Sequence, residues 1–91
     1  MKSNFLLGEL KLEDAARIKL KRIPMDLIAR HAIQEHGVLN AKEAAANEAA
    51  MKSLGEIKSR YFVDPTNHDK GCVLVTTRRT WDRTMVSLER S

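Results

Sequence analysis

The spacing of apolar positions predicts helices in the first two thirds of the chain. Between residues 24 and 36 the apolar side chains recur three and four positions apart, at Met25, Ile28, Ala29, Ala32 and Ile33. Pro24 suits the first turn of a helix, and Gly37 suits the position just after its end. The pattern therefore predicts an amphipathic helix over residues 24–36.

The alanine-rich stretch 40–60 predicts a further helix. Asn40 and Glu43 are spaced as in a capping box, and the alanines that follow are the strongest helix formers. Two interpretations remain open for this stretch. Either residues 40–60 form one unbroken helix, or a break near Asn47 divides them into two. One unbroken helix would place five apolar residues on one face: Ala46, Ala50, Leu54, Ile57 and Tyr61.

Residues 10–23 carry two conflicting patterns. A helical face is formed by Leu12, Ala15, Ala16, Leu20 and Ile23, whereas residues 17–21 alternate basic and apolar side chains as a strand does. We favour a helix that ends before Pro24. Residues 1–9 are predicted to be a loosely held arm, and residues 10–91 a single domain.

After Tyr61 the pattern changes to that of strands. Residues 64–71 are dense in turn formers, and residues 72–77 are an apolar, β-branched run. A polar break at 78–80 precedes a second alternating run at 84–88. The predicted fold class is therefore α+β: two or three helices, then a small antiparallel β-hairpin or three-stranded meander that the helices cover on one face.

Composition limits the classes of protein that the chain can belong to. With 43% apolar residues, many of them alanine, and four aromatic rings, the predicted core is thin, and a homodimer would supplement it. A single cysteine excludes an internal disulfide, and no apolar run approaches the roughly 20 residues that span a bilayer. We therefore expect a cytoplasmic protein with no membrane partner.

Charge is concentrated at both ends of the chain. Residues 1–24 hold six Lys or Arg against three Asp or Glu, and residues 58–91 hold seven against four. The middle, 25–57, holds three against five. Basic ends suit a polyanion such as nucleic acid, although an ordinary solvated surface is the alternative interpretation.

No catalytic or metal-binding motif stands out. Cys72 heads an apolar strand, which favours a small core residue over a nucleophile. His31 and His36 are five positions apart, on different faces of a helix, so they do not form a ligand pair. His68 near Cys72 is read as a solvated turn residue. We predict no enzyme activity, metal, cofactor or small-molecule substrate.

The order of elements over residues 25–77 resembles a winged helix-turn-helix, in which two helices precede a β-hairpin. The segment VDPTNHDKGCVLVT (63–76) is similar to the wing of repressors of the multiple-antibiotic-resistance family, which pairs Asp-Pro and polar residues with a β-branched strand. This resemblance implies DNA binding, with the tip of the hairpin on the DNA backbone.

These observations predict a small, basic, nucleic-acid-binding regulatory protein. Its expected contacts with duplex DNA or another nucleic acid are the cations Lys52, Lys58, Arg60, Lys70, Arg78, Arg79 and Arg83. Trp81 lies among the last of these and either stacks a base or packs over the end of the sheet.

The alternative function is a protein-binding adaptor or inhibitor of the kind that phages and plasmids carry. Its interface would be the alanine-rich helix 40–60, through Ala46, Ala50, Met51 and Leu54.

Overall fold

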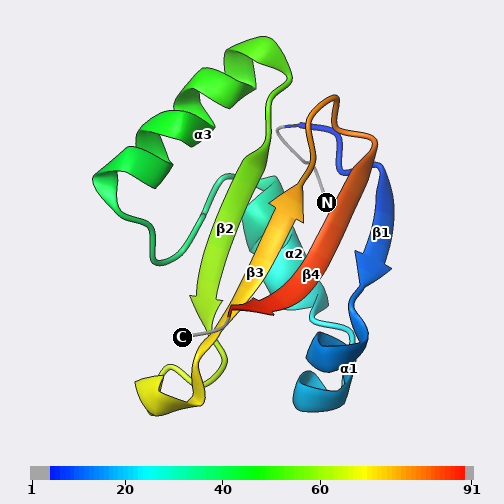
Figure 1. The fold of residues 1–91 in the computed structure, drawn as a ribbon, viewed down its shortest axis with the longest axis vertical. Helices are drawn as coiled ribbons and strands as arrows, with labels where there is room; N and C mark the ends of the chain where they lie inside the picture. The colour runs from blue at the N-terminus through cyan, green and yellow to red at the C-terminus, as the bar shows by residue number, and fades with distance from the viewer. Residues whose placement is uncertain (1–4, 90–91) are drawn as a thin grey trace.

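A four-stranded mixed sheet forms the centre of the molecule (Figure 1). The computed structural model describes residues 5–89. The strands lie in the order β1 (Glu9–Leu12), β4 (Arg83–Glu89), β3 (Cys72–Thr77) and β2 (Ile57–Phe62). β1 pairs with β4 in parallel, and the other two pairs are antiparallel. The α+β class is confirmed, but the sheet has one strand more than the predicted meander, and that strand precedes the helices.

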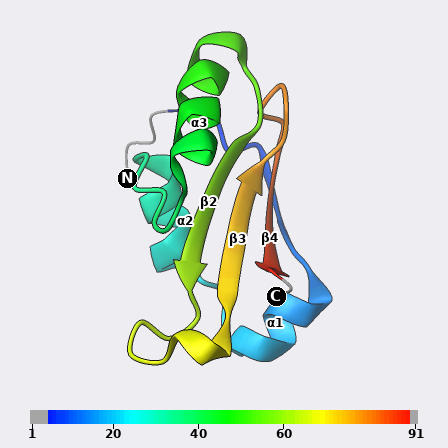
Figure 2. The same ribbon diagram turned by 60° about the vertical axis from the view of Figure 1, so that its left-hand side comes forward.

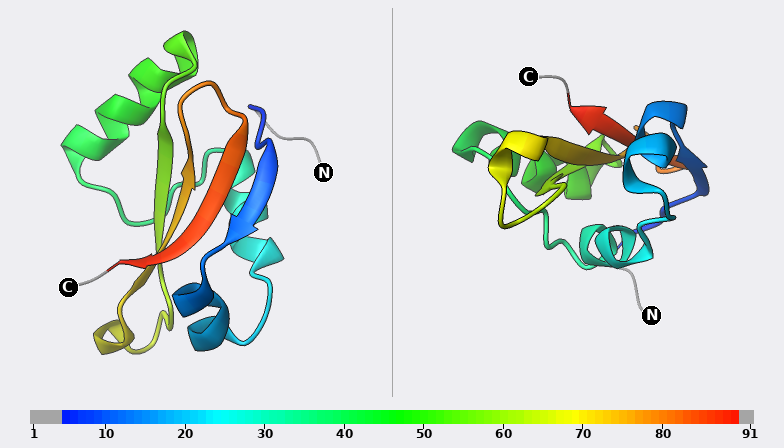
Figure 3. Two further views of the ribbon diagram at one scale, coloured as in Figure 1. Left: turned by 45° about the vertical axis from the view of Figure 1, so that its right-hand side comes forward. Right: turned by 90° about the horizontal axis from the view of Figure 1, so that it is seen from below.

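Among the described residues, three helices lie against one face, one edge and one end of this sheet. α2 (Met25–Ala32) covers one face, which we call the inner face (Figures 1 and 3). α3 (Ala41–Ser53) runs beside the free edge of β2, and α1 (Asp14–Leu20) lies at the end of β1 (Figure 2). The core lies between α2 and the inner face, where alternate strand residues are buried: Ile57, Tyr61, Val73, Val75 and Val86.

The N-terminal third differs from the predicted helix over 10–23. Glu9–Leu12 is a strand, because its backbone pairs with β4, which lies more than seventy positions along the chain and leaves no local signal. α1 is short and ends where Lys21 adopts a left-handed conformation (φ 56°). Part of the predicted arm is also ordered, since Phe5 is only 4% exposed, whereas residues 1–4 lie outside the described residues.

Both interpretations of residues 40–60 are wrong. α3 begins as predicted, with Asn40 and Glu43 completing the capping box, and it passes Asn47 without a break. It ends at Ser53, where Leu54 turns left-handed (φ 55°), and Ile57 opens β2. The alanines favour helix locally, but pairing with the β-branched residues of β3 makes the next segment a strand.

The other predictions differ less from the structure. The helix predicted over 24–36 ends at Ala32, because Gln34 adopts a left-handed conformation (φ 65°) before the chain reaches Gly37. The predicted strand 72–77 is confirmed as β3, and 84–88 lies within β4. The turn between β2 and β3 contains a short 3-10 helix (His68–Lys70). Within residues 5–89 no helix is long and apolar enough to cross a membrane.

The free edge of β2 is covered by side-chain and loop groups. The Asn47 amide donates to the carbonyl of Lys58 (2.7 Å), and its oxygen accepts from the Lys58 N–H (2.9 Å), so one side chain imitates a neighbouring strand. Two residues on, the Arg60 backbone bonds with His36 and Val38 of the loop before α3. This cover blocks strand addition at this edge.

We therefore predict that Asn47→Ala lowers the free energy of unfolding by about 2 kcal/mol, because both backbone groups of Lys58 lose their partner. Urea unfolding followed by circular dichroism measures the change. Glu48→Ala, on the exposed side of the same helix, is the matched control and should change stability little. Equal stability of Asn47→Ala and the control would contradict the role given to Asn47.

Candidate functional site

The face of the sheet opposite α2, here called the outer face, is not covered by any helix of the described residues (Figures 1 and 3). The pairing register brings the intervening strand residues together on this face: Lys11, Lys58, Arg60, Leu74, Thr76, Arg83, Met85 and Ser87. Cys72 also lies on this face, half-buried, rather than in the predicted core. Burial raises the pKa of the Cys72 thiol, and the nearby Glu89 charge adds to the effect.

A hollow of about 360 Å³ lies on the outer face, toward the β3–β4 turn. It is lined by Thr76, Arg78, Arg83, Met85 and Ser87. Its lining residues include two arginines, a serine and a threonine, and no acidic residue. This set of donors suits an oxyanion such as a phosphate group.

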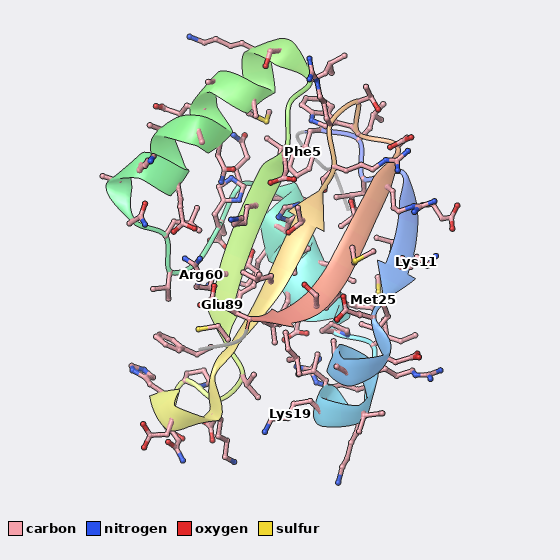
Figure 4. All side chains as sticks on the ribbon, viewed as in Figure 1. Phe5, Lys11, Lys19, Met25, Arg60 and Glu89 are labelled. Carbon is pink, nitrogen blue, oxygen red and sulfur yellow. The ribbon has the colours of Figure 1, made fainter. Side chains whose placement is uncertain are left out.

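Arg60, a predicted nucleic-acid contact, is held by carboxylates of its own chain. Its guanidinium donates to both oxygens of Glu43 (2.7 and 2.8 Å) and to Glu89. Figure 4 labels Arg60 and Glu89, which lie close together. These hydrogen bonds raise the pKa of Arg60 and lower that of Glu43 to about 2. The charge of Arg60 is thus used to join α3, β2 and β4.

Three other predicted contacts also have acidic partners. Lys58 lies 3.7 Å from Glu43, Lys70 lies 3.6 Å from Asp64, and Arg78 bonds Asp82. The last two pairs are exposed, so water and salt compete with them, and they can exchange partners at little cost.

The remaining predicted cations are Lys52, Arg79 and Arg83, which have no ion pair among residues 5–89. Arg83 lines the hollow on the outer face. Arg79 is exposed in the β3–β4 turn, and Lys52 lies on α3, away from the hollow. The structure therefore brings Arg83 and Arg78 together and leaves Lys52 and Lys70 apart from them.

Trp81 packs over the end of the sheet, which was one of the two interpretations of this residue. Its indole N–H donates to the carbonyl of Gly55 (2.8 Å), and its ring lies 5.5 Å from that of Phe5. The ring contributes to a small apolar cluster with Ile57 and Met51. It is absent from the lining of the hollow.

The predicted protein interface on α3 is partly occupied. Ala50 is buried and Met51 is half-buried, both packed in the cluster that holds Phe5. Ala46 and Leu54 are exposed. Two of the four candidate residues therefore face the protein's own core.

A buried chain of hydrogen bonds crosses the inner side of the sheet, and none of its residues was among the predicted site residues. We call it the polar chain. It joins six residues in order: His36, Ser59, His31, Thr77, Thr84 and Leu7. His31, Ser59, Thr77 and Thr84 are fully buried, yet every buried side-chain polar atom among residues 5–89 has a partner. The two histidines come together because α2 ends before His36, so they do not lie on different faces of one helix.

The proton positions in the polar chain follow from its last member. The Leu7 carbonyl can only accept, so Thr84 donates to it (2.6 Å) and accepts from Thr77 (2.6 Å). Thr77 must then accept from the Nε2–H of His31 (2.9 Å).

The other half of the polar chain is then fixed as well. Burial, with a smaller effect of the His36 charge, lowers the pKa of His31 to about 3, so its ring is neutral. The unprotonated Nδ1 of His31 therefore accepts from Ser59 (2.6 Å), which accepts from the Nδ1–H of His36 (2.7 Å).

A serine beside a histidine is also the arrangement of a nucleophile and its base. Here both Ser59 and His31 are fully buried, so a substrate cannot reach the Ser59 oxygen without opening the core. The polar chain is therefore an internal support. Within residues 5–89 no group of three or more His, Cys, Asp or Glu side chains could hold a metal ion.

Comparisons of the chain with protein-family models, with curated proteins and with solved structures found no match.

The polar chain makes stability depend on pH. Burial lowers the pKa of both His31 and His36 below the ordinary value of 6.5. Below about pH 6.5 the unfolded chain binds protons that the folded protein refuses, so stability is full above this pH and is lost as the pH falls toward 3. From His31 alone we expect a loss of about 2 kcal/mol between about pH 7 and pH 5.

Urea unfolding at several pH values measures this loss, in a range above that where the carboxylates titrate. His31→Gln is the comparison variant, because its amide can still donate and accept but does not titrate. Its stability should change less over the same interval. A wild-type stability that is constant from about pH 7 to pH 5 would show that neither histidine is held neutral.

Proposed function

We propose that this protein is a small, non-enzymatic nucleic-acid-binding protein that holds phosphate groups on the outer face of its sheet. The observation that supports the proposal is the hollow on the outer face, whose lining includes Arg78 and Arg83 beside Thr76 and Ser87. Arginine pairs well with phosphate oxygens, and hydroxyls are common additional phosphate donors.

The surroundings of the hollow favour an extended ligand over a single anion. Lys11, on β1, and Lys58, on β2, lie in one register row with Thr76 and Met85. A backbone that crosses the strands would therefore pass from one cation to the next. Glu9 and Glu89 also lie on this face and limit its net charge. Binding through contacts between the cations and phosphates is expected to weaken as salt rises.

In this proposal α3 does not contact the bases of the nucleic acid. Its inward side packs on β2 through Asn47 and Glu43, and its Lys52 lies apart from the outer face. The winged-helix resemblance of residues 25–77 stays a prediction, as does a protein interface on α3, of which Ala46 and Leu54 remain accessible.

The test is a titration of fluorescently labelled single-stranded RNA, single-stranded DNA and duplex DNA at several salt concentrations. We expect binding at low salt that falls as salt rises. Arg83→Gln should weaken binding by about fivefold to tenfold and flatten the salt dependence, because one phosphate contact is lost.

Lys52→Gln is the matched control, since it removes the same charge on α3 and should leave affinity nearly unchanged. If Lys52→Gln weakens binding and Arg83→Gln does not, the nucleic acid lies on α3 and the outer-face proposal is wrong. Absence of binding to all three probes at low salt would overturn nucleic-acid binding altogether.

A further inference from the structure

A second surface lies at the β1 edge of the sheet, which is the edge opposite β2. It is a groove of about 670 Å³ between β1, α1 and α2. We call it the β1 groove. Ten residues line it: Leu10, Lys11, Leu12, Arg17, Lys21, Arg22, Ile23, Met25, Ile28 and Val86. In Figure 4, Lys11 and Met25 mark two sides of this region.

The floor of the β1 groove is apolar and partly open to water. Ile28 and Val86 belong to the core, and Leu12 packs against it. Above them, Leu10, Ile23 and Met25 are 45, 65 and 51% exposed. Adjacent large apolar side chains left this accessible are typical of a binding surface.

The rim of the β1 groove is wholly cationic. Lys11, Arg17, Lys21 and Arg22 line it, and no carboxylate does. Arg17 and Arg22 bond Asp14 and Asp26 in exposed pairs, which a ligand carboxylate can replace at little cost. Lys11 and Lys21 have no ion pair among residues 5–89.

β1 is also an open edge of the sheet. The N–H groups of Glu9 and Glu13 donate to carbonyls of Asp82 and Val86, on the β4 side. In parallel pairing the alternate residues point the other way, so Leu10 and Leu12 turn their backbone N–H and C=O groups outward. Unlike the edge of β2, this edge has no cover among residues 5–89.

We propose that the β1 groove binds an extended, acidic and apolar segment of a partner protein as an added fifth strand. Backbone groups of Leu10 and Leu12 would pair with the segment. Its alternate apolar side chains would cover Ile23 and Met25, and its Asp or Glu side chains would face the cationic rim. The open edge and the cationic rim are independent observations that select the same occupant.

Charge argues against a second copy of this chain at the same place. A copy paired through β1 would bring its own Lys11, Arg17 and Lys21 against the same cationic rim. The homodimer predicted from the thin core therefore stays a prediction that has no support from this groove. The proposal does not depend on the nucleic-acid proposal, because the β1 groove and the hollow on the outer face share no lining residue. Lys11 is the one residue that both proposals use.

The test uses a labelled peptide of about eight residues in which Glu alternates with Leu and Val, against the same peptide with Lys in place of Glu. We expect fluorescence anisotropy to detect the acidic peptide only. In ¹H–¹⁵N spectra the backbone amides of Leu10 and Leu12 should shift on binding, and those of α3 should not. No binding of the acidic peptide, or shifts confined to α3 or the outer face, would overturn the proposal.

Two variants separate the backbone and charge contributions. Leu10→Pro removes an outward N–H and leaves the bonds to β4 intact, and proline is tolerated on edge strands. Lys21→Asp reverses one rim charge at a left-handed position that aspartate tolerates. Each should weaken peptide binding by about tenfold or more, with thermal melting used to confirm folding.

Lys42→Asp, on exposed α3, is the matched control for net charge and should keep the wild-type affinity. If it weakens binding as much as Lys21→Asp does, the attraction is general and the groove is not the site. If the protein alone sediments as a dimer that Leu10→Pro makes monomeric, a second copy occupies the edge and the proposal of an acidic partner fails.

Discussion

The polar chain that runs from His36 to the carbonyl of Leu7 is the constraint on which the rest of the structure depends. It crosses the loop after α2, α2 itself, three strands and the segment before β1. A buried hydroxyl or imidazole that loses its partner costs more than an ordinary hydrogen bond contributes. Every link therefore needs the next one, and the six groups fix how α2 and the N-terminal segment sit on the inner face.

The polar chain also decides which surfaces of the sheet remain exposed and able to bind a partner. α2 and the polar chain take the inner face, and Asn47 with the His36–Val38 loop takes the edge of β2. Among the described residues, the outer face and the β1 edge are left uncovered. Both carry cations, but the outer face adds hydroxyls and the β1 groove adds apolar side chains. This difference is why we propose different anionic partners for the two surfaces, nucleic-acid phosphates for the outer face and an acidic polypeptide for the β1 groove.

Local patterns in the sequence predicted what depends on neighbouring residues. The capping box at Asn40 placed the start of α3, and the β-branched run placed β3 residue for residue. The patterns failed where pairing is distant: Glu9–Leu12 is a strand only because β4 lies beside it, and the end of α3 depends on β2 joining β3.

The sequence predicted individual residues of the candidate site but not which of them the fold brings together. The basic C-terminal third placed Arg78 and Arg83 among the predicted contacts, and that role stays a prediction. The sequence could not show that Glu43, 17 positions away, holds Arg60. The polar chain left a faint signal, namely Ser59, Thr77 and Thr84 at alternating strand positions that proved to be inward. The spacing of His31 and His36 did not predict their proximity, because it depends on where α2 ends.

The most direct test of this account is the tautomer of His31. A long-range ¹H–¹⁵N spectrum of the imidazole rings, recorded near pH 7 and near pH 5, shows which nitrogen carries the proton. The direction of the polar chain predicts a neutral His31 with the proton on Nε2 at both pH values, with slow hydrogen exchange. A proton on Nδ1, or a charged ring near pH 5, would contradict the central role given to the polar chain.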